Sequence, residues 1–129
     1  MSLPIKRGLV VLDNHARELI YGEKLVAEIA RRVELAGPPL DRDELAANPS
    51  LLKDVEVIFT GWGAPQMSAD LLAAAPKLKA VFYGAGSVRA MVTDAFWGRG
   101  VALTSAYAMN AVPVSEYTLA TILFSLKQG

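Results

Sequence analysis

The hydrophobic residues of this chain fall into short runs that alternate with amphipathic stretches. Five runs end at turn residues, as buried parallel strands do, and they span residues 8–12, 33–35, 55–59, 78–83 and 101–104. Between them, apolar residues recur at helical spacing, which predicts helices at 15–20, 23–32, 41–47, 68–75, 93–98 and 112–126. This alternation predicts a doubly wound α/β fold with a parallel sheet of about five strands.

The last of these helices is apolar over most of its circumference. Its apolar residues are Ala111, Val112, Val114, Leu119, Ala120, Ile122, Leu123, Phe124 and Leu126. Such a helix needs burial on several sides, whereas we expect the sheet domain to cover one side only. We therefore divide the chain into a domain at 1–109 and a protruding helix at 110–129, through which we expect a homodimer to form.

Charge and composition narrow the range of partners. Thirteen basic and thirteen acidic residues balance, which argues against nucleic acid or an anionic membrane as the main partner. The chain has no cysteine and one histidine, so we expect neither a disulfide nor a metal site. No signal-peptide pattern and no membrane-spanning apolar run occurs. These features predict a cytoplasmic protein that binds a small neutral or singly charged ligand.

The loop after the fourth strand is the strongest candidate for chemistry. In LKAVFYGAGSVR an apolar strand ends at Tyr83 and continues into Gly84, Ala85 and Gly86. Backbone with few side chains lets an anion approach its N–H groups, and ligands of parallel sheets lie beyond the carboxyl ends of strands. Paired glycines after a strand are equally typical of a simple tight turn, so both interpretations stay open.

Other candidates have a functional and a structural interpretation. Trp62, beside Gly63 in the loop after the third strand, could wall an apolar pocket or only cover the core. His15 could act as a general base, although a lone histidine that opens a helix is more often solvated or capping. Arg89 could steer a carboxylate, although a surface ion pair is the commoner role of a single arginine.

Several nucleotide and phosphate motifs do not fit. Arg89 stands where a dinucleotide fingerprint needs a small residue, and no acidic residue ends the strand at 101–104. A receiver domain needs an aspartate and a lysine where Thr60 and Ser105 stand. The charged segment 13–17 is unlike the phosphate loop of a flavodoxin, and the glycine-lysine ending of a P-loop is absent from the sequence.

From Leu78 to Leu126 the chain resembles the D-isomer-specific 2-hydroxyacid dehydrogenases, the family of phosphoglycerate and glycerate dehydrogenases. The matching segments are AVFYGAGSV, then Asp94 with WGRGVALTS, then NAVP followed by VSEYT. A weaker match from Gly8 to Pro76 includes the loop TGWGAP. In this family the amino-terminal segment forms a flavodoxin-like substrate-binding domain, and a Rossmann domain that binds NAD or NADP follows the long helix.

The resemblance implies that the chain is the N-terminal substrate-binding part of an oxidoreductase that interconverts 2-hydroxy and 2-keto acids. The substrate-binding residues that it implies are Trp62, Gly63, Tyr83, Gly84, Ala85 and Gly86. It also implies cofactor contact at Ala85 and Tyr117, where relatives often carry a hydroxyl residue and threonine respectively. These two departures argue against the side-chain hydrogen bonds that relatives make to the cofactor and leave backbone contact.

The resemblance places no catalytic residue in this chain, because the family's catalytic arginine, acidic residue and histidine all lie beyond the long helix. We therefore expect the isolated chain to be inactive and to bind no NAD tightly. The alternative is a stand-alone module that binds a small molecule or dimerises without catalysis.

Overall fold

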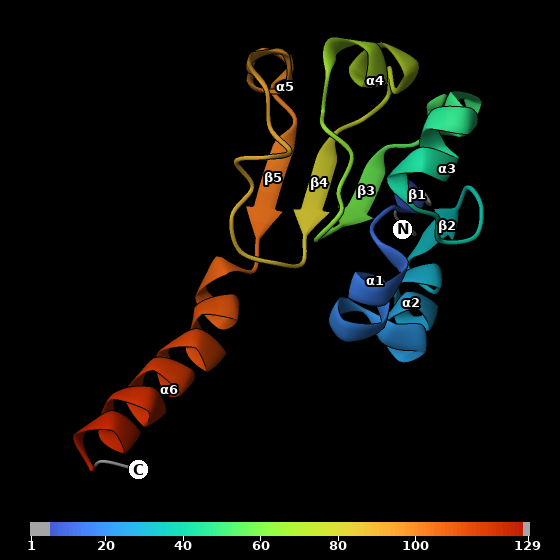
Figure 1. The fold of residues 1–129 in the computed structure, drawn as a ribbon. Coiled ribbons are helices and arrows are strands. Elements are labelled where there is room, and N and C mark those ends of the chain that lie inside the picture. The colour runs from blue at the N-terminus through green and yellow to red at the C-terminus, as the bar shows by residue number, and fades with distance from the viewer. Residues whose placement is uncertain (1–5, 128–129) are drawn as a thin grey trace, which may run out of the picture.

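A computed structural model describes residues 6–127, which form a five-stranded parallel sheet with helices on both faces (Figure 1). The strands follow the order β2-β1-β3-β4-β5 and are β1 (Lys6–Val10), β2 (Val33–Leu35), β3 (Val57–Thr60), β4 (Ala80–Tyr83) and β5 (Ala102–Ser105). The helices are α1 (Asn14–Ile20), α2 (Gly22–Ala30), α3 (Arg42–Ala47), the 3-10 helix η1 (Pro49–Leu52), α4 (Ala69–Ala74), α5 (Asp94–Arg99) and α6 (Tyr107–Leu126). The predicted flavodoxin-like α/β fold is confirmed.

Side-chain caps explain where four of the helices begin. Asp13, Asp41, Ser68 and Thr93 accept hydrogen bonds from first-turn N–H groups of α1, α3, α4 and α5. Asp41 forms a reciprocal capping box with Glu44. Each cap satisfies N–H groups that have no partner inside the helix and contributes about 1 kcal/mol. The polar residues that separate the apolar runs thus fix the starts of the helices.

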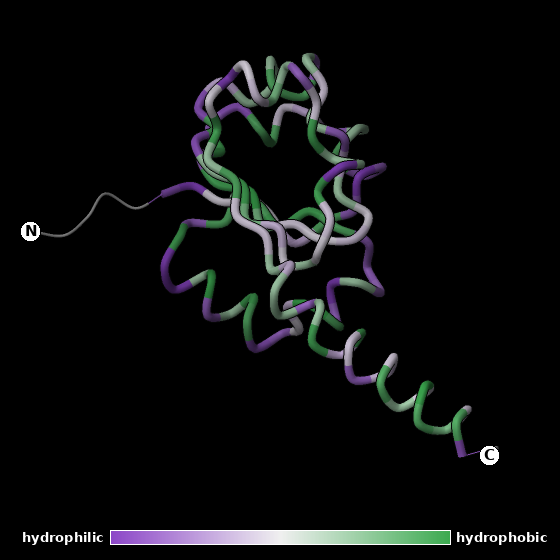
Figure 2. The backbone as a smooth tube through the Cα atoms, turned by 90° about the vertical axis from the view of Figure 1, so that its left-hand side faces the viewer, coloured by the Kyte–Doolittle hydropathy of each residue, from purple (hydrophilic) through white to green (hydrophobic). Residues whose placement is uncertain are grey.

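The two faces of the sheet are covered unequally (Figure 2). The larger core contains Ile58, Val81, Met67 and Phe96, which are buried on the face covered by α3, α4 and α5. Helices α1 and α2 pack on the other face over β1 and its neighbours. On that face Phe82 of β4 is 41% exposed, so the area over β4 and β5 has no helical cover.

Helix α6 leaves the carboxyl edge of the sheet and projects from the domain (Figure 1). It begins at Tyr107, earlier than the expected Val112, and continues through Pro113. None of its residues is buried, so the expectation that the domain covers one of its sides is wrong. Within residues 6–127, no helix combines the length and the apolar character needed to cross a lipid bilayer.

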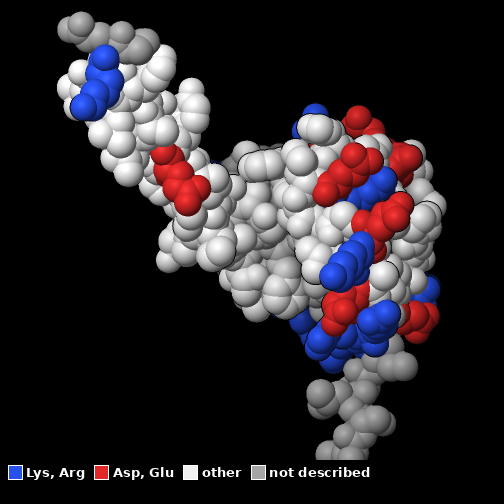
Figure 3. Space-filling model, turned by 90° about the horizontal axis from the view of Figure 1, so that it is seen from below, with Lys and Arg blue, Asp and Glu red and all other residues white. Residues whose placement is uncertain are grey.

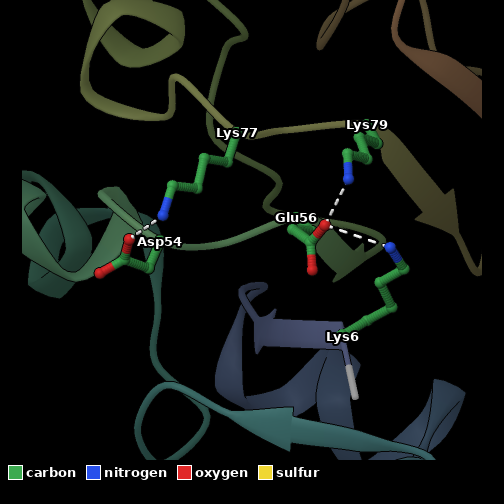
Figure 4. A network of polar contacts seen from close by, with 5 residues as sticks. All are labelled: Lys6, Asp54, Glu56, Lys77 and Lys79. Carbon is green, nitrogen blue, oxygen red and sulfur yellow. Dashed lines mark hydrogen bonds and ion pairs between the residues drawn. The ribbon is translucent and has the colours of Figure 1, made fainter. Parts of the chain in front are cut away.

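An ion-pair network joins the amino ends of β1, β3 and β4 (Figure 4). Oε1 of Glu56 accepts hydrogen bonds from Nζ of Lys79 at 2.5 Å and from Nζ of Lys6 at 3.3 Å. The hydrogen bond from Lys79, followed by that from Lys6, lowers the pKa of Glu56 to about 2. Beside this network, Lys77 donates to Asp54 at 2.5 Å.

We predict that the stabilisation by Glu56 is present at neutral pH and is lost in acid. Because the pKa of Glu56 is 4.5 ordinarily and about 2 in the folded chain, only the unfolded chain binds this proton between those values. The free energy of unfolding should therefore fall as the pH drops from about 4.5 to about 2. Urea titrations across this range should show a weaker dependence for Glu56→Gln than for the exposed control Glu34→Gln; equal profiles would refute the prediction.

Arg99 at the end of α5 binds the carboxyl end of α4. Its guanidinium donates to the carbonyls of Leu72 at 2.7 Å, Ala75 at 2.9 Å and Pro76 at 2.8 Å. The last carbonyls of a helix have no hydrogen-bond partner within the helix. The guanidinium of Arg99 supplies donors to these carbonyls, and its positive charge interacts favourably with the negative end of the helix dipole.

We predict that Arg99→Met lowers the free energy of unfolding by about 2 kcal/mol, because three hydrogen bonds from a charged donor are lost. The control Arg31→Met removes an exposed ion pair of 3.6 Å with Glu28. It should change the free energy of unfolding by less than about 0.5 kcal/mol. Urea unfolding of both variants measures the difference, and similar values for the two would contradict the role given to Arg99.

Candidate functional site

The loops after β1 and β3 meet at the carboxyl edge, at the point where the strand order reverses. Ligands of doubly wound sheets bind at such a switch point. The two loops are joined by a hydrogen bond of 3.1 Å from the N–H of Asp13 to the carbonyl of Trp62. Thr60, buried beneath them, donates its hydroxyl to the carbonyl of Val11. These contacts hold the edge rigidly beside the loop that follows β4.

The loop after β4 combines bound carbonyls with free amides. Oγ of Ser105 donates to the carbonyl of Ala85 at 3.0 Å and to that of Gly86 at 2.6 Å. Among residues 6–127, no acceptor is found for the N–H groups of Ala85, Gly86, Ser87 and Val88. Ala85 is fully buried, whereas Gly86 is half-buried and Ser87 exposed. A ligand can therefore reach the amides of Gly86 and Ser87 most directly.

Gly84 has a different role from the one expected. Its N–H donates to the carbonyl of Thr60 at 2.8 Å and continues the ladder between β3 and β4, so this amide is not available to a ligand. A Cβ at this position would lie 2.5 Å from Cγ2 of Ile20. The lack of a side chain at Gly84 therefore serves the close packing of α1 against the strand end.

Asn110 brings α6 to the glycine loop, a feature that the sequence pattern did not reveal. A Cβ on Gly86 would lie 2.9 Å from Nδ2 of Asn110. Within the described part of the chain, the Asn110 carboxamide makes no hydrogen bond, and its backbone N–H binds the carbonyl of Ala106 in the first turn of α6. The side chain thus places an additional donor beside the free amides.

Tyr21 supports the same strand ends from the other side. Its hydroxyl donates to the carbonyl of Thr60 at 2.8 Å and to that of Phe82 at 3.3 Å. Burial raises the pKa of Tyr21 to about 12. This hydroxyl remains protonated at neutral pH, and it fixes the junction of α1 and α2 to β3 and β4.

The predicted pocket residues do not line one common hollow. Tyr83 and Gly84 line a groove of about 410 Å³ beside α2, and burial raises the pKa of Tyr83. Gly63 lines a separate cavity of about 180 Å³ together with Asp13. Trp62 is 48% exposed and lines neither of these hollows.

The remaining candidates are exposed. Tyr117 lies on the projecting part of α6 and is 75% exposed. His15 stands at the start of α1, and Arg89 lies in the loop after β4. The surface seen from the carboxyl ends of the strands carries its charges mainly on one side, while α6 and its junction with the domain are largely uncharged (Figure 3).

Comparison with known proteins assigns neither a family nor a function to the chain. No protein-family model matches the chain, and no match was found among curated proteins or solved structures. The site is therefore described by its own chemistry: backbone amides and one carboxamide that together suit a small anion.

We predict that Gly63→Ala destabilises the carboxyl edge. Gly63 has a φ of +79°, and an added Cβ would lie 2.6 Å from Cβ of Asp13. Backbone strain and the clash should lower the free energy of unfolding by about 2 kcal/mol. Gly98→Ala, in α5 with open space around it, should be neutral or stabilising. Thermal unfolding compares the two, and an equally stable G63A variant would refute the assigned strain.

Proposed function

We propose that this chain is the substrate-binding part of an NAD- or NADP-dependent D-2-hydroxyacid dehydrogenase and that it holds the carboxylate of a 2-hydroxy or 2-keto acid. The observation that supports this most directly is the pair of reachable amides at Gly86 and Ser87, which lack acceptors in the described structure. The sequence resemblance of residues 78–126 to that family supports the choice of acid.

The proposed contacts follow from the geometry of the loop. A carboxylate only accepts hydrogen bonds, and N–H donors directed at an anion form stronger bonds than they do with neutral acceptors. Gly86 and Ser87 supply two such donors, and Nδ2 of Asn110 supplies a third beside them. Because Ser105 binds the carbonyls of the loop, the amide side of the backbone is left for the ligand. Amides recognise the carboxylate rather than the rest of the acid, so this site suits 2-hydroxy and 2-keto acids as a class and does not select one of them.

The described residues fit a nicotinamide cofactor poorly. Ala85 has no hydroxyl and is fully buried, which leaves only indirect or backbone contact there. Tyr117 is exposed on α6. It replaces the threonine that many members of the dehydrogenase family carry there. When bound, the nicotinamide would accept the hydride from the 2-hydroxy acid or donate it to the 2-keto acid. The proposed role of this chain is to bind and orient the acid.

A second function is supported by α6, in which no residue is buried. A stand-alone module that dimerises through this helix would cover the exposed apolar side chains. A reading frame that continues beyond Gly129 into a strand and a GxGxxG turn would favour the dehydrogenase, and a stop codon there would favour the module.

We predict that a 2-keto acid shifts the backbone amide resonances of Gly86 and Ser87. Pyruvate titrated into ¹⁵N-labelled chain should perturb these two signals, whereas acetone, which lacks the carboxylate, should not. Asn110→Asp places a negative charge beside the site and should weaken binding at least tenfold, while Asn48→Asp, at the end of α3, should not. Unchanged amide signals at saturating pyruvate would refute the carboxylate site.

We also predict that the 129-residue chain alone does not oxidise NADH in the presence of a 2-keto acid. It contains no dinucleotide fingerprint, so the nicotinamide is not held against the substrate. Absorbance at the NADH band should stay constant over hours, and measurable turnover would contradict the division of labour proposed for this chain.

A further inference from the structure

One face of the sheet carries an uncovered apolar surface, which we call the bare face. It consists of Ala80, Phe82, Ala102 and Thr104, which share one side of β4 and β5 by register and are exposed or half-buried, with the half-buried Phe59 of β3 at its border. The rings of Phe59 and Phe82 stack with centroids 5.4 Å apart. A groove of about 410 Å³ runs along this surface beside α2. Since β4 is an interior strand, its face is expected to be covered in a doubly wound sheet.

Helix α6 is the second uncovered apolar surface of the same chain. Its 20 residues span about 30 Å, long enough to leave the domain and reach another molecule. The half from Leu119 to Leu126 contains no charged residue, and Leu119, Ile122, Leu123 and Phe124 are all more than half exposed. A surface of this kind is unusual on a monomer.

We propose that two copies of this chain pair by exchange, with the second half of each α6 lying in the groove on the bare face of the other copy. A twofold axis makes the contact reciprocal, so one arrangement covers both apolar surfaces. The proposal deepens the self-association considered for α6 and does not depend on the dehydrogenase assignment.

The direction of α6 favours docking of a second copy's α6 in the groove over docking of the chain's own α6. Ala106 lines the end of the groove, and α6 departs from it in a direction away from the domain (Figure 1). Folding α6 back would break the hydrogen bond of 2.9 Å from Asn110 to Ala106 that closes its first turn. The same helix can enter the groove of another copy with this turn intact.

Charge and area also fit. Glu28 and Arg32, which line the groove on α2, already bind each other at 3.1 Å, so docking an uncharged helix buries no unpaired charge there. A standard interface buries roughly 1,600 Å² in total, so each of the four surfaces in this reciprocal arrangement needs to contribute about 400 Å². Apolar patches of about this size occur on single proteins.

Cysteine cross-linking tests the arrangement cleanly because the chain has no cysteine. The variants T104C, on the bare face, and I122C, on α6, are purified separately, mixed and oxidised. We expect a T104C–I122C disulfide between copies to be the main product. The control A73C, exposed on α4 and far from the groove, should give less than a tenth of that yield with I122C.

Light scattering supplies an independent readout. The parent chain should have the mass of a dimer, Phe82→Glu should be monomeric, and Trp97→Glu, exposed on the opposite helical layer, should remain dimeric. The proposal would be overturned if the parent chain were monomeric or if the main cross-linked product were I122C–I122C. It would also be overturned if a chain that carries both T104C and I122C formed the disulfide within itself. The amide signals of Gly86 and Ser87 report the carboxylate site separately, so the two proposals fail independently.

Discussion

The hydrogen bond from Gly84 to Thr60 is the last rung of the ladder between β3 and β4, and the candidate site begins where this ladder ends. Beyond it the chain turns across the end of β5, where Ser105 binds the carbonyls of Ala85 and Gly86. Buried or half-buried N–H groups rarely remain without an acceptor. The amides left on the other side of this loop are therefore the part of the edge best suited to a ligand anion.

The same edge is built to keep that loop in place. Tyr21 and Thr60 bind carbonyls at the ends of β1, β3 and β4, and Ile20 fills the space that the missing side chain of Gly84 leaves. A preformed loop loses little conformational freedom on binding, which favours recognition of a small acid. In contrast, the bare face and α6 lie at the periphery and are uncovered, which suits contact with another molecule.

The order of elements could be predicted from the sequence, because apolar runs, caps and glycine turns are local signals. The start of α6 could not be predicted in this way. The helix begins at Tyr107 and continues through Pro113, which has no N–H to donate to the carbonyl of the exposed residue Met109. The expectation for Gly84 failed for another reason: its amide pairs with Thr60, and its missing Cβ makes room for Ile20.

Long-range contacts account for the rest of what the sequence did not reveal. Asn110 meets Gly86, Ser105 meets Ala85, and Tyr21 meets Thr60 across wide gaps in the chain. Hydroxyl and carboxamide groups of this kind give no periodic pattern, so only the assembled sheet brings them together. The glycine loop was predicted as a candidate site, whereas the division between its bound and free amides needed the structure.

Amide hydrogen exchange, measured residue by residue with and without pyruvate, distinguishes the bound amide of the glycine loop from its free amides. We expect slow exchange at Gly84 in both conditions, because its N–H is bound in the ladder. We expect fast exchange at Ser87 and intermediate exchange at Gly86 in the free chain, both slowed at least tenfold at saturating pyruvate. Protection of Gly86 and Ser87 without ligand, or no change when pyruvate is added, would refute the carboxylate site.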